Sequence, residues 1–162
     1  MCTMVKKVFF LLVISLVLST FLLPACGGGE ERGFGIFLVD TGELILSEKH
    51  IKAYHGGTHE IELNEEGMKK WNSYIPPDAK LGGLYTKDFV IKIGEEEIYR
   101  GKFWSLVSSS SYAGVVILDA LGVFGNKLLI EFGYPSSYNC TEKDPRDNPQ
   151  IISYFEKQGL LK

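Results

Sequence analysis

The feature that most restricts the fold of this chain is a series of short apolar runs separated by turn residues. Polar and apolar residues alternate at 60–63, and every second residue is apolar at 89–93 and 128–132, which predicts half-buried strands. Residues 115–118 are apolar on both faces, which predicts a strand in the middle of a sheet. Turns containing glycine, such as Asp40-Thr41-Gly42, favour hairpins and therefore a largely antiparallel sheet. The expected strands are residues 35–39, 43–46, 60–63, 89–93, 97–104, 115–118 and 128–132.

Three segments have the pattern of helices. We expect them from Ser47 through Ala53, from Asn64 to the Pro76-Pro77 pair, and from Asp147-Asn148-Pro149 to about Lys157. In the second of these, Met68, Trp71 and Ile75 share one face and should point at a core. Strands outnumber helices, so we expect an α+β fold: a mostly antiparallel sheet with two or three helices packed on it, in a single domain.

The N-terminal segment has a different pattern. Lys6 and Lys7 precede residues 8–23, which form a stretch of 16 residues without charge. A membrane-spanning helix needs about 20 apolar residues, and the core of a signal peptide is shorter. The stretch ends in Leu23-Pro24-Ala25-Cys26, followed by three glycines. This ending resembles the lipobox of bacterial lipoprotein precursors.

The resemblance to a lipoprotein implies a layout for the whole chain. Residues 1–25 would be the signal peptide, and residues 26–33 a flexible tether to a domain at residues 34–162. Cys26 would be the lipidated N-terminus, whose fatty acids, such as palmitate, hold the protein on a membrane. That membrane is the cell membrane or the outer membrane, with the domain facing outside the cytoplasm. The alternative is an uncleaved anchor helix that contains Cys26.

Charge and cysteine content restrict the function classes. The chain has a formal net charge of −3, and because Lys6 and Lys7 precede Cys26, the rest has 15 basic against 20 acidic residues, or −5. Nucleic-acid binders usually show a basic excess, so we expect no nucleic-acid partner. With Cys2 removed in the signal peptide and Cys26 lipidated, Cys140 has no cysteine left to pair with, which excludes a disulfide framework.

Three stretches resemble the periplasmic head of the SecD protein-export subunit. Residues 44–53 (LILSEKHIKA) are similar to its first strand and the segment that follows, and residues 61–71 (IELNEEGMKKW) to a later strand and helix. Residues 90–98 (VIKIGEEEI) are similar to one of its hairpins, and the match spans about residues 44–118. The resemblance implies a head-like fold and contact with other polypeptides. It implies no motor or export activity.

All three histidines, His50, His55 and His59, lie close together in the sequence, beside Glu60 and Glu62. A zinc site needs three or four converging nitrogen, sulfur or oxygen ligands. The predicted elements place one histidine on a helix, one in a glycine loop and one at a strand start, which does not imply convergence. We therefore interpret them as surface histidines and expect no metal or cofactor. A metal-binding or enzymatic site at these three residues is the alternative.

The segment Tyr134-Pro135-Ser136-Ser137-Tyr138 is a loop with two tyrosines that no helix or strand pattern buries. Loop tyrosines offer a large apolar area with a polar tip, which recognition sites use. Tyr134 and Tyr138 are therefore the candidate binding residues.

No residue stands out as catalytic. The serines at 108–111 lack the Gly-x-Ser-x-Gly pattern of a nucleophile, and the acids at 95–97 fit a solvated turn. The sequence predicts a non-enzymatic, membrane-tethered module that binds another protein or polypeptide. A lipoprotein that captures a small solute is a further alternative.

Overall fold

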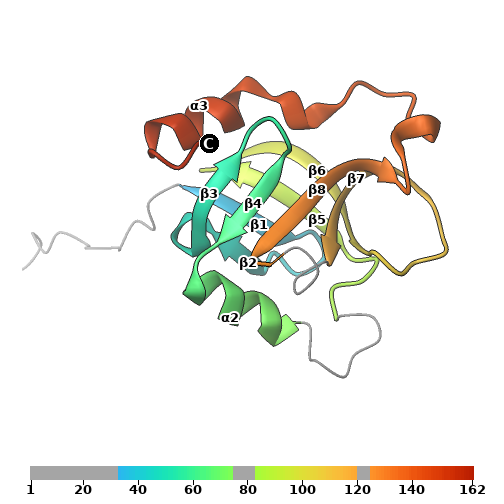
Figure 1. The fold of residues 1–162 in the computed structure, drawn as a ribbon, viewed down its shortest axis with the longest axis horizontal. Helices are drawn as coiled ribbons and strands as arrows, with labels where there is room; N and C mark the ends of the chain where they lie inside the picture. The colour runs from blue at the N-terminus through green and yellow to red at the C-terminus, as the bar shows by residue number, and fades with distance from the viewer. Residues whose placement is uncertain (1–32, 75–82, 120–124) are drawn as a thin grey trace, which may run out of the picture. The chain divides into compact units, whose positions relative to one another are not determined.

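The alternating runs form an eight-stranded sheet in the computed structural model, which describes residues 33–74, 83–119 and 125–162 (Figure 1). Within these residues the strand order is β2-β1-β5-β6-β7-β8-β4-β3, and neighbours run antiparallel except β6 and β7, which run parallel. The elements are β1 (Phe34–Leu38), β2 (Leu44–Ser47), η2 (Glu48–His50), β3 (Ile51–His55), β4 (Glu60–Leu63), α2 (Glu65–Tyr74), β5 (Asp88–Ile93), β6 (Glu96–Ser105), β7 (Tyr112–Asp119), β8 (Lys127–Tyr134), η3 (Ser137–Asn139), η4 (Pro145–Asp147) and α3 (Pro149–Lys157).

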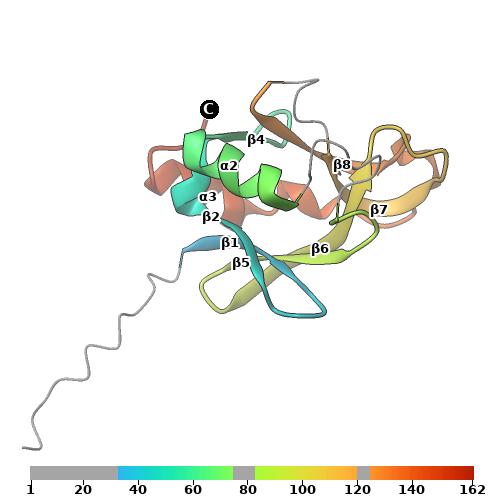
Figure 2. The same cartoon turned by 90° about the horizontal axis from the view of Figure 1, so that it is seen from below.

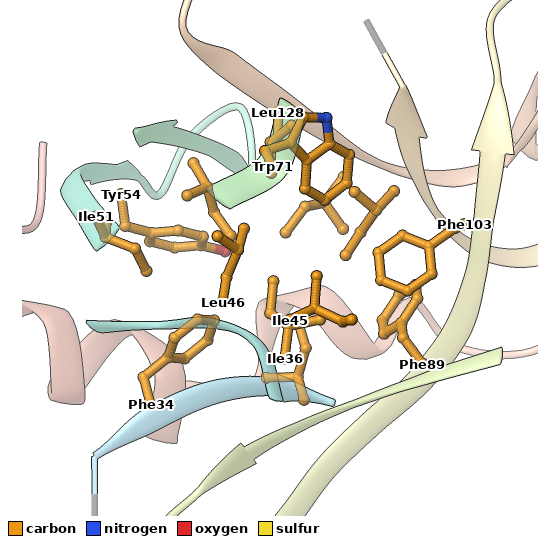
Figure 3. Packing of buried hydrophobic residues seen from close by; sticks show 14 of the residues in the cluster. Phe34, Ile36, Ile45, Leu46, Ile51, Tyr54, Trp71, Phe89, Phe103 and Leu128 are labelled. Carbon is orange, nitrogen blue, oxygen red and sulfur yellow. The ribbon is translucent and has the colours of Figure 1, made fainter. Parts of the chain in front are cut away.

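One hydrophobic core receives side chains from all eight strands, because the sheet curls around it (Figure 2). Ile36 of β1 and Leu128 of β8 come from distant strands of the sheet, yet they lie in the same buried cluster. Figure 3 shows these two residues on opposite sides of the packed side chains. Full burial of each such side chain contributes about 1.5–3 kcal/mol, so this core is the main source of stability. The expected fold class, α+β with a mostly antiparallel sheet, is confirmed.

Helix α2 begins at a capped end, as expected. The side chain of Asn64 accepts a hydrogen bond of 2.9 Å from the backbone N–H of Gly67. Trp71 is 1% exposed, and its ring lies 5.9 Å from that of Phe103, so the predicted inner face of this helix is confirmed at this residue. Ile75 and the Pro76-Pro77 pair, where the helix was expected to end, lie outside the described residues.

Helix α3 is also capped as predicted. The side chain of Asn148 accepts a hydrogen bond of 2.9 Å from the backbone N–H of Gln150, and a proline occupies the first turn. Phe155 stacks on Tyr54 of β3, with ring centroids 4.7 Å apart. The two helices pack on opposite sides of the curled sheet (Figure 1). Beyond α3, residues 160–162 run along β3 and form backbone hydrogen bonds with Tyr54.

The predicted helix from Ser47 through Ala53 is wrong after its first turn. Only η2 is helical, and the chain then continues as β3, which pairs antiparallel with β4. Ile51 and Tyr54 are buried in the core on this strand. The capping signal at Ser47 is local, and strand pairing with burial of these two side chains outweighs it.

Strands β6 and β7 depart from the expected hairpin pattern. They lie side by side in parallel, so residues 106–111 must return the chain to the starting end of β6 before β7 begins. Since β7 lies between β6 and β8, the prediction that residues 115–118 form a strand inside the sheet is confirmed.

No helix among the described residues is long and apolar enough to span a membrane. The predicted signal peptide (1–25), Cys26 and all of the tether (26–33) except its last residue lie outside the described residues. The lipoprotein assignment therefore stays a prediction.

Candidate functional site

A second, smaller hydrophobic cluster lies on the outer face of the sheet, at β6, β7 and β8. Successive residues of β7 point to opposite faces, so Val115 and Ile117 enter the main core while Val116 and Leu118 enter this second cluster. At its centre Trp104 is 7% exposed. We call this group, with the side chains packed on Trp104, the outer cluster.

Two tyrosines hold the β6–β7 crossover against the outer cluster. The Tyr134 hydroxyl donates a hydrogen bond of 2.7 Å to the carbonyl oxygen of Leu106. The Tyr85 hydroxyl shares one of 2.9 Å with Oγ of Ser108. The rings of Tyr85 and Tyr134 lie 5.3 and 6.3 Å from that of Trp104. The crossover is therefore fixed in place by aromatic packing and by hydrogen bonds.

The prediction that no element buries Tyr134 is wrong. Strand β8 continues to this residue, which pairs with Tyr112 and is half-buried. Gly133 interrupts the apolar alternation directly before Tyr134, so the sequence pattern ends before the strand does. Gly133 has a φ of +85°, and a Cβ there would lie against the backbone of the following loop. Tyr138, in contrast, is 92% exposed.

A pocket of about 500 Å³ opens beside Tyr134, between the crossover, the end of β8 and the chain that follows. Ligand pockets commonly have volumes of roughly 300–1,000 Å³. Among the described residues, the large hydrophobic side chains that are exposed are Val39, Val107 and Tyr138. Val107 is 78% exposed, and both Val107 and Tyr138 follow directly on residues that line the pocket. The apolar part of the lining includes Leu106, Leu118, Leu129 and Phe132.

The polar wall of the pocket is built around Arg146. Its Nε and Nη2 donate to the carboxylate of Asp144 at 3.0 and 2.7 Å, and Nη1 donates to the carbonyl oxygen of Ile130 at 2.6 Å. Burial acts to raise the pKa of Asp144, but the hydrogen bonds and charge of Arg146 outweigh it and hold that pKa below its ordinary value. Glu131 also lines the pocket, and its carboxylate lies 3.9 Å from Arg146. Asp144 thus matches the charge of Arg146, whereas Glu131 contacts Arg146 at a longer distance.

The three histidines do not converge on one point. His50 is buried and accepts a hydrogen bond of 2.9 Å at Nδ1 from the backbone N–H of Ser47. Nε2 of His55 lies 3.5 Å from Glu62. No three histidine, cysteine or acidic side chains in the described ranges are grouped so that they could hold a metal ion. The prediction that the histidines are surface residues is wrong for His50 and for His59, which is also buried.

His59 belongs to a polar chain that the sequence did not reveal. Its Nδ1 shares a hydrogen bond of 3.3 Å with the Tyr54 hydroxyl, and its Nε2 lies 3.5 Å from Asp147. Burial raises the pKa of Tyr54 to about 12, and this side chain is 1% exposed. The Tyr54 hydroxyl therefore stays protonated and is shielded from any substrate. This chain of polar contacts links β3, the β3–β4 turn and η4.

The sequence pointed to Tyr134, which lines the pocket, and to Tyr138, which directly follows a lining residue, but it gave no indication of most of the other lining residues. For Glu131 the sequence contained a weak indication, because a polar residue within an apolar strand is expected to face away from the core. For Arg146 and Asp144 it contained none, because they lie in an irregular segment that only tertiary packing brings against β8.

Comparisons with family models, with curated proteins and with solved structures found no match to this chain. The resemblance of residues 44–118 to the SecD head therefore stays a prediction from sequence.

Proposed function

We propose that this chain is a membrane-tethered lipoprotein whose extracytoplasmic domain binds another polypeptide at the pocket beside Tyr134. The observation that carries the proposal is that the two most exposed of the large hydrophobic side chains in the described residues, Val107 and Tyr138, each directly follow a residue that lines the pocket. Exposed apolar residues beside a pocket are typical of surfaces that a partner covers.

Support for a polypeptide partner comes from the character of the surface. The pocket combines an apolar wall with a few polar groups, the arrangement that holds an anchoring side chain of a protein partner. Tyr138 offers a large contact area that loses little conformational entropy when it is covered. The sequence resemblance of residues 44–118 to a domain of the export machinery favours the same class of partner.

The position of the pocket fits a tethered protein. The start of β1, where the N-terminal segment joins the domain, and the segment that follows β8 lie at opposite ends of the described domain in both views (Figures 1 and 2). The chain therefore enters the described domain at the end away from the pocket, so the start of β1 does not cover the pocket.

Lipidation is tested by replacing the thiol that would carry the lipid. We expect Cys26→Ser to accumulate as an uncleaved precursor without lipid, because a thiol is needed for the thioether bond to diacylglycerol. Growth with a radioactive fatty acid, followed by gel analysis, measures the incorporation. Equal labelling of the wild type and the variant would contradict the lipoprotein assignment.

Binding is tested by crosslinking in the native membrane. We expect the double variant Val107→Ser/Tyr138→Ala to lose the crosslinked polypeptide that the wild type captures. The control is Val39→Ser, which changes an exposed hydrophobic residue in the β1–β2 turn, outside the pocket lining. All three proteins should keep the wild-type thermal midpoint. A wild type without a specific crosslinked polypeptide, or an equal yield from the double variant, would overturn the proposal.

A further inference from the structure

The charges around the pocket point to the chemistry of its partner. Resting on the proposed function above, we infer that the pocket takes a polypeptide segment in which a bulky apolar side chain is flanked by lysine or arginine, with Glu131 as the charge partner. The apolar wall receives the bulky side chain, and the carboxylate of Glu131 attracts the cation beside it.

The segment that contains the polar wall carries an excess of negative charge. Residues 131–147 include four acidic side chains, at 131, 142, 144 and 147, against two basic ones, Lys143 and Arg146. The mature part of the chain as a whole has the same sign, at −5 once Lys6 and Lys7 are set aside. An acidic partner segment would therefore be repelled, and a basic one attracted over a distance of about 8–10 Å at physiological salt.

Of these four acidic residues, Glu131 is the one positioned to bind a cation of the partner. Asp144 is engaged by two nitrogens of Arg146, whereas the carboxylate of Glu131 makes one contact with Arg146, at 3.9 Å. The Glu131 side chain is 49% exposed and lines the pocket. It can therefore turn to an incoming cation without breaking the Asp144–Arg146 pair.

The apolar wall of the pocket favours a bulky apolar side chain next to the cation in the partner segment. Leu118, Leu129 and Phe132 give the pocket an apolar side that a small polar residue would leave uncovered. Lysine and arginine have apolar stems, so they can lie along the rim while their charged ends reach a carboxylate. The exposed ring of Tyr138 adds a face to which a cation is attracted.

The size of the effect follows from the exposure of Glu131. A partly exposed ion pair contributes roughly 0.2–1 kcal/mol, which corresponds to about a 1.5- to 5-fold change in the dissociation constant. We expect a loss near the upper end of this range for Glu131→Gln in low salt, and a smaller loss in 0.5 M salt, where the charges are screened.

The experiment uses the full chain in detergent and four fluorescent 12-residue peptides that share one scaffold. Three have a central phenylalanine flanked by lysine, glutamine or glutamate, and the fourth has a central alanine flanked by lysine. We expect the phenylalanine–lysine peptide to bind most tightly. Glu131→Gln should bring its affinity down to that of the phenylalanine–glutamine peptide. The matched control is Glu142→Gln, an exposed acid in the same segment that does not line the pocket, and it should leave the preference intact.

The outcomes separate the inference from the proposed function. If peptides bind and the double variant Val107→Ser/Tyr138→Ala abolishes binding, but Glu131→Gln leaves the charge preference unchanged, the charge inference is wrong and the binding site stands. A preference for glutamate-flanked peptides would also show that the charge inference is wrong while the binding site stands. If none of the four peptides binds, or if binding ignores Val107 and Tyr138, both the proposed binding site and the inference are overturned.

Discussion

Replacing Trp71 with alanine removes the largest fully buried side chain in the described part of the chain. A buried tryptophan covers up to about 250 Å², which at about 25 cal/mol per Å² gives roughly 6 kcal/mol. Residual compactness of the unfolded chain and the retained Cβ reduce this figure to about 3–5 kcal/mol. Nε1 of Trp71 has no hydrogen-bond partner among the described residues, so the estimate contains no hydrogen-bond contribution.

The free energy of unfolding is measured by guanidinium denaturation followed by circular dichroism. We expect Trp71→Ala to lower it by about 3–5 kcal/mol, and Trp71→Phe by less, because an aromatic ring keeps part of the contact with Phe103. Tyr138→Ala is the control, since this exposed side chain should change stability by less than about 0.5 kcal/mol. An unchanged midpoint for Trp71→Ala, or an equal loss for Tyr138→Ala, would refute the burial argument.

Two further predictions concern helix packing and pH. A Cβ at Gly67 would clash with the carbonyl oxygen of His50, so we expect Gly67→Ala to lower the free energy of unfolding by about 1–3 kcal/mol. The control is Gly57→Ala, whose Cβ would meet no atom within 4 Å and should leave stability close to the wild-type value. Thermal melts compare the two variants, and equal midpoints would contradict the close approach of Gly67 to His50. Burial lowers the pKa of His50 and of His59 from 6.5, so the unfolded chain binds more protons between the lowered values and pH 6.5. Their contribution to stability is therefore complete above pH 6.5 and is lost as the pH falls through that window. Urea unfolding at pH 7.5 and 5.5 measures how much the free energy of unfolding falls on acidification. We expect a smaller fall for the double variant His50→Gln/His59→Gln than for the wild type. An equal fall in the two proteins would contradict the attribution of the pH dependence to these histidines.

The strands and the helix caps could be predicted from the sequence because their signals are local. Alternation with a period of two defines the strands at 60–63, 89–93 and 128–132 to within a few residues. Asn64 and Asn148 cap their helices through hydrogen bonds that reach only two or three residues along the chain. Such features depend little on the rest of the fold.

The candidate site could be predicted only in part, because its residues come from distant segments. Tyr138 was visible as a loop aromatic, but the pocket beside it exists only where Leu118, Leu129 and Arg146 meet. The Tyr134 side chain shows the same limit, since its hydroxyl finds its partner at Leu106, 28 positions earlier in the chain. Sequence spacing contains no information about contacts of this kind.

The sequence by itself determined the strands other than β3 and the two capped helices, whereas the interpretation of Cys26 as a lipid attachment site stays a prediction. The tertiary structure alone decided that residues 51–55 form a strand, that β6 and β7 run parallel and that His59 lies beside Asp147. The physical reason is clearest for residues 51–55, where Ile51 and Tyr54 are buried in the core. A local preference is worth a few tenths of a kcal/mol to about 1 kcal/mol per residue, whereas burying one large apolar side chain contributes about 1.5–3 kcal/mol, so burial prevails where the two conflict.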